Sequence, residues 1–199
     1  PQIDGSAFMR AFYIMGCAEL MAFIKESEVN LNRKATSSYF EVGTWVTALL
    51  AKQYHADEYA RALFLLKLTG RRVGKFFQKY DVLLTPTLAE PPVITGTFSP
   101  KGMQLTAAKV IARLNAGWVV KNLLGVDALV GQAFAFNPFA PLFSATGQPA
   151  MSLPLHWNDA GLPIGMQFVS RFGDEATLFR LAGQLEKAKP WIGRVPPVS

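Results

Sequence analysis

Residues 81–87 have the sequence DVLLTPT, and this stretch decides the fold class. A short, continuous apolar run that ends at a proline is typical of a strand buried on both faces. The run follows residues 57–78, in which apolar side chains recur at intervals of three and four, as on one face of a helix. A helix that leads directly into a buried strand is typical of α/β architecture. The sequence therefore predicts an α/β fold.

Further helices are predicted on both sides of this stretch. Upstream, the spacing of apolar residues predicts a helix over residues 4–25. Ser37 and Ser38 stand where the N-cap of a second helix is expected. Downstream, Thr106 is expected to cap a helix that carries Trp118 on one side.

The last third of the chain predicts a hairpin and a final helix. Residues 125–147 combine phenylalanines with prolines and predict an irregular segment. Residues 150–155 and 163–170 are strand candidates joined by turn-forming residues, so they are expected to pair as neighbours. Asp174 is expected to cap the last helix with its carboxylate. No linker or repeat divides the sequence, which predicts that residues 1–199 form a single unit.

The basic charge of the chain raises the question of a nucleic-acid partner. The formal net charge is +6 at pH 7. Lysines and arginines are scattered singly, however, and no predicted helix combines a basic face with aromatic side chains that could stack on bases. The sequence therefore predicts no binding to nucleic acid.

The single cysteine and the hydropathy pattern bear on location. Cys17 has no second cysteine with which to form an internal disulfide, and it lies among apolar residues, which favours a reducing, cytoplasmic compartment. No stretch reaches the roughly 18 uninterrupted apolar residues typical of a membrane-spanning segment. We expect a cytoplasmic protein without a membrane partner. The chain begins at Pro1, from which we expect that an upstream part exists.

Several short motifs in a fixed order resemble the carboxy-terminal part of the amidase-signature hydrolases. They are DVLLTPT at 81–87, TGQPAMSLP at 146–154, GLPIGMQF at 161–168, GDE at 173–175, and the closing LE at 185–186 with PW at 190–191. Residues 41–45 and 56–59 are also similar to this family and favour its bacterial branch of the 6-aminohexanoate cyclic dimer hydrolase type. The resemblance covers nearly the whole chain.

This resemblance implies a fold, an activity and the location of the catalytic residues. The fold it implies is the C-terminal part of an α/β/α layered structure around a mixed, twisted sheet. The activity it implies is hydrolysis of a linear or cyclic carboxylic amide through an acyl-enzyme, with a serine nucleophile, a second serine on a cis peptide and a lysine. Those residues belong to the amino-terminal half of such enzymes. This sequence has neither a Gly-Gly pair nor a Gly-Ser-Ser-Gly run. We therefore expect no catalytic residue here and no activity of the chain alone.

The chain also lacks the residue patterns of other reactive sites. Lys34 beside Ser37 and Ser38 has no neighbouring glycines that would form an oxyanion hole. The two histidines, His55 and His156, are far apart in the sequence and have no second cysteine or Glu-x-x-His motif beside them. The sequence predicts neither a metal site nor a cofactor.

Seven residues are candidates for the wall of a substrate pocket. Thr85 and Thr87 end the predicted strand, and ligands bind beyond strand ends in open α/β sheets, although proline can also simply terminate a strand. An apolar pocket with a few polar groups suits an amide, and this points to the aromatic segment. Its candidates are Phe139, Phe143, Thr146 and Gln148, with a plain core role as the alternative for the phenylalanines. Cys17 is a pocket-wall candidate because of the fold that the resemblance implies.

Three functions remain open from the sequence. The first is a serine amidohydrolase that acts on a small-molecule amide, in which the missing N-terminal half of the same protein is the partner of this chain. The second is an amidotransferase-type subunit that works on aminoacyl-tRNA. The third is a non-catalytic binding or assembly module of the same fold. Because a truncated sheet leaves apolar faces uncovered, we also expect the isolated chain to associate, for example as a homo-oligomer.

Overall fold

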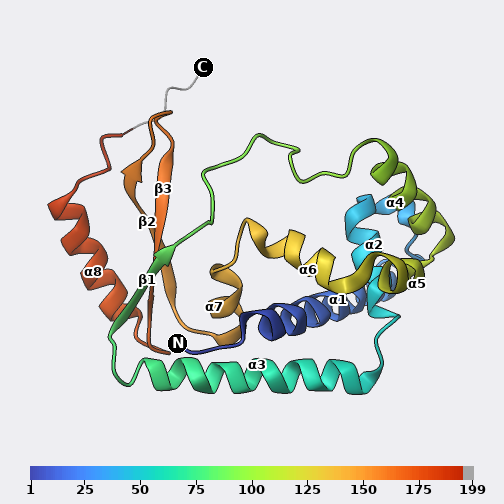
Figure 1. Cartoon of the computed structure of the whole chain (residues 1–199), viewed down its shortest axis with the longest axis horizontal. Helices are drawn as coiled ribbons and strands as arrows, with labels where there is room; N and C mark the ends of the chain where they lie inside the picture. The colour runs from blue at the N-terminus through green and yellow to red at the C-terminus, as the bar shows by residue number, and fades with distance from the viewer. Residues whose placement is uncertain (195–199) are drawn as a thin grey trace. The chain divides into compact units, whose positions relative to one another are not determined.

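The protein is described by a computed structural model over residues 1–194, apart from the side chain of Leu124. The chain groups into two compact units (Figure 1). The sheet unit contains residues 1–3, 67–93 and, among the described residues, 135–194, and the helical unit contains residues 4–66 and 94–134. Each unit is assembled from segments separated in sequence, so no linker marks a boundary. That residues 1–199 act as a single domain stays a prediction.

The sheet unit is built on three strands. They are β1 (Val82–Pro86), β2 (Ala150–Trp157) and β3 (Pro163–Ser170). The order is β1-β3-β2, and both pairings are antiparallel. The α/β class is thereby confirmed. Within the described residues the sheet is antiparallel, and β1 and β2 are its two edges.

The β2–β3 hairpin has the predicted position and partners. Two hydrogen bonds between Asn158 and Leu162 close its turn. The Asn158 N–H donates to the Leu162 carbonyl at 3.0 Å, and the Leu162 N–H donates to the Asn158 side-chain Oδ1 at 2.9 Å. Gly161 adopts a φ of +75° in this turn, a conformation that glycine accepts without steric cost. The prediction that these two strands are neighbours is confirmed.

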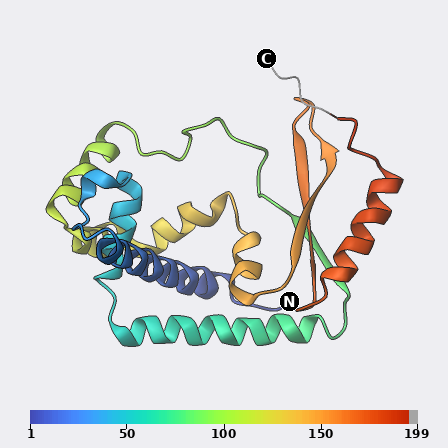
Figure 2. The ribbon, with the colours of Figure 1, turned by 180° about the vertical axis from the view of Figure 1, so that it is seen from behind.

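Helices complete the sheet unit. Helix α8 (Glu175–Ala188) packs against β2 and β3, and in both views it runs beside the strands (Figures 1 and 2). Successive strand residues point to opposite faces, and Phe168 and Val169 on β3 are both buried. Both faces of the central strand are therefore covered at this point. A shorter helix, α7 (Ala140–Thr146), precedes β2.

The helical unit is made of helices alone among its described elements. They are α1 (Gly5–Asn30), η1 (Ser37–Tyr39), α2 (Val42–Ala51), the first part of α3 (Ala56–Phe76), α4 (Gly102–Leu114), α5 (Gly117–Val119), the π-helical η2 (Val120–Gly125) and most of α6 (Val126–Ala135). α1 begins where the sequence predicts, because Asp4 accepts a hydrogen bond from the Ala7 N–H at 3.0 Å. The core joins Ile24 of α1, Trp45 of α2 and Ala112 of α4.

Two predicted helix caps are wrong. Ser37 and Ser38 lie in η1, and α2 begins later, at Val42, after Glu41, whose side chain makes no capping hydrogen bond. Thr106 lies inside α4, where its hydroxyl donates to the Gly102 carbonyl at 3.3 Å. Threonine can form this bond inside a helix as well as cap one, so the residue type alone did not fix where α4 begins.

The aromatic segment is more regular than predicted. Residues 126–135 and 140–146 form helices α6 and α7. Pro141 lies in the first turn of α7, where a proline fits because that position needs no hydrogen-bonding N–H. Trp118 does not belong to the fourth helix, because Asn115 turns the chain out of α4 with a φ of +52°.

Two further expectations about the sheet unit need correction. β1 is not buried on both faces in the described structure, since Leu84 is 52% exposed. The reason is that β1 is an edge strand here. Asp174 does precede α8, but its carboxylate accepts from the Thr177 hydroxyl at 2.8 Å and caps no backbone amide.

Helix α1 is long and apolar enough, by length and composition, to cross a membrane, and it is the one such helix among the described residues. Core helices of globular proteins meet the same criterion. In this structure Phe8, Ile14 and Ile24 of α1 are buried, and the helix packs against α2. The absence of a membrane partner stays a prediction.

Candidate functional site

A pair of hydroxyl groups joins the three strands at the end of β1. Thr87 extends the pairing of β1 by one residue, because its N–H donates to the Gly165 carbonyl at 3.0 Å. Its hydroxyl oxygen lies 2.6 Å from that of Ser152, which belongs to the opposite edge strand, β2. The two hydroxyls therefore meet across the central strand, β3, above Gly165.

Gly165 leaves the space in which these hydroxyls meet. A Cβ atom at this position would lie 2.6 Å from Ser152 Oγ and 2.8 Å from Thr87 Oγ1. Both distances are shorter than van der Waals contact, so any side chain at position 165 would push the hydroxyls apart. A glycine inside a strand often marks such a close approach.

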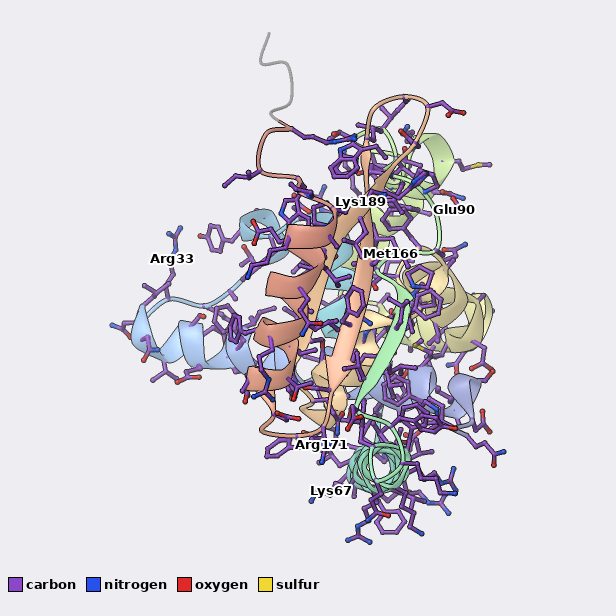
Figure 3. All side chains as sticks on the ribbon, turned by 90° about the vertical axis from the view of Figure 1, so that its left-hand side faces the viewer. Arg33, Lys67, Glu90, Met166, Arg171 and Lys189 are labelled. Atoms are coloured by element: carbon purple, nitrogen blue, oxygen red, sulfur yellow. The ribbon has the colours of Figure 1, made fainter. Side chains whose placement is uncertain are left out.

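A cavity of about 510 Å³ opens beside the hydroxyl pair. It is lined by residues 86–92, residues 163–165, Ser152 and Pro154, all of which belong to the sheet unit. Prolines and aliphatic side chains make up most of this lining. In Figure 3 Met166 lies near the middle of β3, Arg171 lies just beyond the end of that strand, and Glu90 lies nearer to the β2–β3 turn than Arg171 does. The site is thus an apolar cavity with a hydroxyl pair in its wall and Glu90 among its lining residues.

The two predicted threonines have different surroundings. Thr87 lines the cavity, whereas Thr85 does not. The Thr85 hydroxyl accepts a hydrogen bond from Gln167 Nε2 at 3.2 Å, and the Gln167 side chain is itself buried. Thr85 therefore connects β1 to β3. Contact of either threonine with a substrate stays a prediction.

The four predicted residues of the aromatic segment lie together on α7 and beside it, and none of them lines the cavity. Phe143 is 4% exposed and belongs to the core, in agreement with the alternative considered for it, and Phe139 is half-buried at the start of α7. The Thr146 hydroxyl donates to the Leu142 carbonyl at 2.8 Å and contacts the buried amide of Gln148. These contacts hold the chain between α7 and β2, and a binding role for these residues stays a prediction.

Comparison with known proteins finds similarity to amidases. Residues 127–179 match the family model "Amidase". A Mycobacterium leprae protein named "Putative amidase AmiC" is 40% identical over 131 residues, which are 66% of this chain and 23% of that protein. This chain is similar to members of the amidase family. The 6-aminohexanoate-cyclic-dimer hydrolase of a Pseudomonas species is 28% identical over 181 residues, 88% of this chain and 33% of that enzyme.

A solved structure has the same fold. The structure of 6-aminohexanoate cyclic dimer hydrolase superimposes with a TM-score of 0.73 at 23% identity, over 95% of this chain and 36% of the other. The amidase-signature fold is thereby confirmed for this chain. The chain spans about a quarter to a third of the length of these curated relatives.

The side chain of Cys17 is a buried thiol. It lies on α1 in the helical unit, is 1% exposed, and packs with Leu50 and Val120. Burial raises the pKa of the Cys17 thiol to about 12. The thiol therefore stays protonated near neutral pH and cannot act as a thiolate nucleophile. A contact between Cys17 and substrate stays a prediction.

The structure also bears on metal binding. Among the described residues, no group of three or more His, Cys, Asp or Glu side chains is placed to hold a metal ion. His156 is on β2, in the sheet unit, and His55 precedes α3 in the helical unit.

Sequence reasoning missed two residues that line the cavity. Ser152 lies in the strand predicted over residues 150–155 and Gly165 in the motif at residues 161–168, and neither was among the predicted pocket residues. Strand alternation places Ser152 and Pro154 on one face of β2, which is the signal that could have drawn attention to them. The meeting of Ser152 with Thr87 depends on β3 lying between β1 and β2, and no local pattern encodes that order.

Proposed function

We propose that this chain is one part of a serine hydrolase that cleaves a linear or cyclic carboxylic amide. The family match carries the proposal, and the names of the relatives, amidases and a cyclic-dimer hydrolase, support it. An apolar cavity with a few hydrogen-bonding groups is suited to a neutral amide. The cytoplasmic location expected from the sequence belongs to the same proposal.

In the proposed reaction the nucleophile comes from residues outside 1–199. A serine hydroxyl attacks the amide carbonyl carbon while a neutral lysine, through a second serine, takes its proton. The C–N bond breaks, the amine leaves with that proton, and the acyl group stays on the serine. Water then hydrolyses the ester, which releases the carboxylic acid and restores the hydroxyl. This chain contributes part of the sheet, the helices that cover it and one wall of the substrate pocket.

The test uses the longest protein that the gene encodes and a chromogenic 4-nitroanilide substrate. The candidate serine and lysine upstream of residue 1 are each replaced by alanine. Each variant is expected to lose about a thousandfold or more in kcat/KM, because residues that act as a unit in covalent catalysis cannot substitute for one another. Ser144→Ala, an exposed serine on α7, is the control and is expected to keep full activity.

The chain of residues 1–199 provides the complementary experiment. Purified alone, it is expected to show no turnover of the anilide. Turnover by this chain, or full activity of the upstream serine variant, would contradict the proposal that the catalytic residues lie outside residues 1–199.

A further inference from the structure

The hydroxyl groups of Thr87 and Ser152 lie where they can form hydrogen bonds with a ligand in the cavity. Both residues line the cavity, and their oxygens are 2.6 Å apart. In such a pair one hydroxyl donates its proton to the other. The second hydroxyl keeps its own proton, and both oxygens keep lone pairs. The pair can therefore donate one hydrogen bond to a ligand and accept another from it.

The rest of the lining defines what kind of ligand suits this element. Among the lining residues, all within the described part of the chain, Glu90 alone carries a charge. Arg194 stands over the ring of Trp157 at 4.1 Å, and Trp157 pairs with the lining residue Pro163, but Arg194 itself does not line the cavity. A carboxylate ligand would thus meet a like charge without a lining cation to balance it. A neutral group that both donates and accepts hydrogen bonds fits best.

We propose that Thr87 and Ser152, held over Gly165, form a subsite for a neutral amide group that carries an apolar chain. The amide C=O accepts from the free hydroxyl proton, the amide N–H donates to a hydroxyl oxygen, and the chain lies against the prolines and Ile164. Gly165 is the specificity-determining position, because any larger residue there displaces the pair. The choice of an amide rests on the proposed function, whereas the position of the site rests on the cavity alone.

Direct binding tests this subsite without relying on catalysis. The probe is hexanamide, titrated into the longest protein that the gene encodes and followed by NMR, with hexanoate as the anionic comparison. Hexanamide is expected to bind more tightly than hexanoate. Thr87→Val and Ser152→Ala keep the local shape and are each expected to weaken hexanamide binding about fivefold, the effect of one neutral hydrogen bond. Gly165→Ala is expected to weaken it about tenfold or more, because both hydroxyls are affected.

Two matched variants serve as controls. Gly183→Ala introduces a methyl group on α8 where nothing lies within 4 Å, and Ser144→Ala removes a hydroxyl that bonds only its own helix, to the Ala140 carbonyl at 3.2 Å. Both are expected to bind hexanamide as the unmodified protein does. Circular dichroism confirms that each variant is folded, and Thr87→Val with Ser152→Ala decide the question if Gly165→Ala does not fold.

The outcomes separate this subsite from the proposed function. Equal hexanamide binding by the unmodified protein, Thr87→Val and Ser152→Ala overturns the subsite, as does tighter binding of hexanoate, even if the protein hydrolyses amides. Loss of binding in these variants supports the subsite even if the protein hydrolyses no anilide. Absence of measurable hexanamide binding in the folded protein also overturns it.

Discussion

The indole Nε1 of Trp45 donates a hydrogen bond to the side-chain oxygen of Asn115 at 3.1 Å. Trp45 is a core residue of α2, and Asn115 is the residue that ends α4 with a φ of +52°. Asparagine adopts this left-handed conformation more readily than most residues do. One asparagine thus ends a helix and satisfies the polar atom of a buried tryptophan that lies 70 residues away in the chain.

Substitutions at Asn115 should separate these two roles. Asn115→Gly keeps the favourable backbone conformation and loses the hydrogen bond, so we expect the free energy of unfolding to fall by about 1 kcal/mol. Asn115→Ala loses both and is expected to cost about 2 kcal/mol, since a left-handed alanine adds roughly 1 kcal/mol. Urea denaturation measures both values. Equal stability of the two variants would show that backbone conformation is irrelevant at this position.

A single methyl group added at Gly117 is expected to lower the stability of the protein strongly. A Cβ atom there would lie 2.7 Å from the Leu49 carbonyl oxygen, a backbone atom that cannot easily move. Gly117→Ala is therefore expected to destabilise the protein by about 1–3 kcal/mol, the usual cost of overpacking. Gly16→Ala on α1 has nothing within 4 Å and is expected to stabilise by about 0.5–1 kcal/mol through helix propensity. Thermal denaturation of the two variants should therefore show shifts of opposite sign.

The buried thiol of Cys17 predicts a loss of stability in alkali. Its pKa is about 12 in the folded protein against an ordinary value of 9. Between these values the unfolded chain releases the thiol proton and the folded protein keeps it. The free energy of unfolding therefore falls as the pH rises from 9 toward 12. Burial raises the pKa of Tyr13 in the same direction, also to about 12.

Replacement of the thiol isolates its share of this effect. Cys17→Ala is expected to make the fall in stability between pH 9 and pH 11 shallower, whatever its constant packing cost at pH 7. Chemical denaturation at several pH values provides the slope. An unchanged slope in Cys17→Ala would mean that the thiol titrates alike in the folded and unfolded states.

The exposed edge strand predicts association of the isolated chain. β1 is an edge of the described sheet, and its Leu84 is 52% exposed. Residues 1–199 alone are expected to bind a hydrophobic dye and to self-associate in sedimentation velocity experiments. Leu84→Lys should reduce the association, because a charge on an edge strand opposes pairing between copies.

A matched substitution distinguishes association through pairing of strand edges from nonspecific hydrophobic association. Phe23 is 65% exposed and lies on helix α1, not on a strand. Phe23→Lys is expected to lower dye binding and to leave association largely unchanged. A monomeric chain that binds no dye would argue against uncovered apolar surface on residues 1–199.

Local patterns in the sequence were sufficient for several elements. Three predicted features depend only on residues close together in the chain. They are the apolar face of α3, the β2–β3 hairpin with Gly161 in its turn, and the start of α1 after Asp4. Each involves side-chain periodicity, a turn or a cap, and these act over a few residues. Such elements can be predicted without knowledge of what packs on them. The caps predicted at Ser37, Ser38 and Thr106 were wrong because serine and threonine also occur in short 3-10 helices and form hydrogen bonds inside α-helices.

The amino-acid sequence by itself determined the α/β class, the family resemblance and the placement of Thr87 at a strand end. Only the tertiary structure showed that Thr87 meets Ser152 over Gly165, that β1 is an edge strand, and that Thr85 connects two strands instead of lining the cavity. The physical reason is that strand order results from the packing of distant segments. The Thr87 and Ser152 hydroxyls are 65 residues apart in the chain, and they come together only because β3 inserts between β1 and β2.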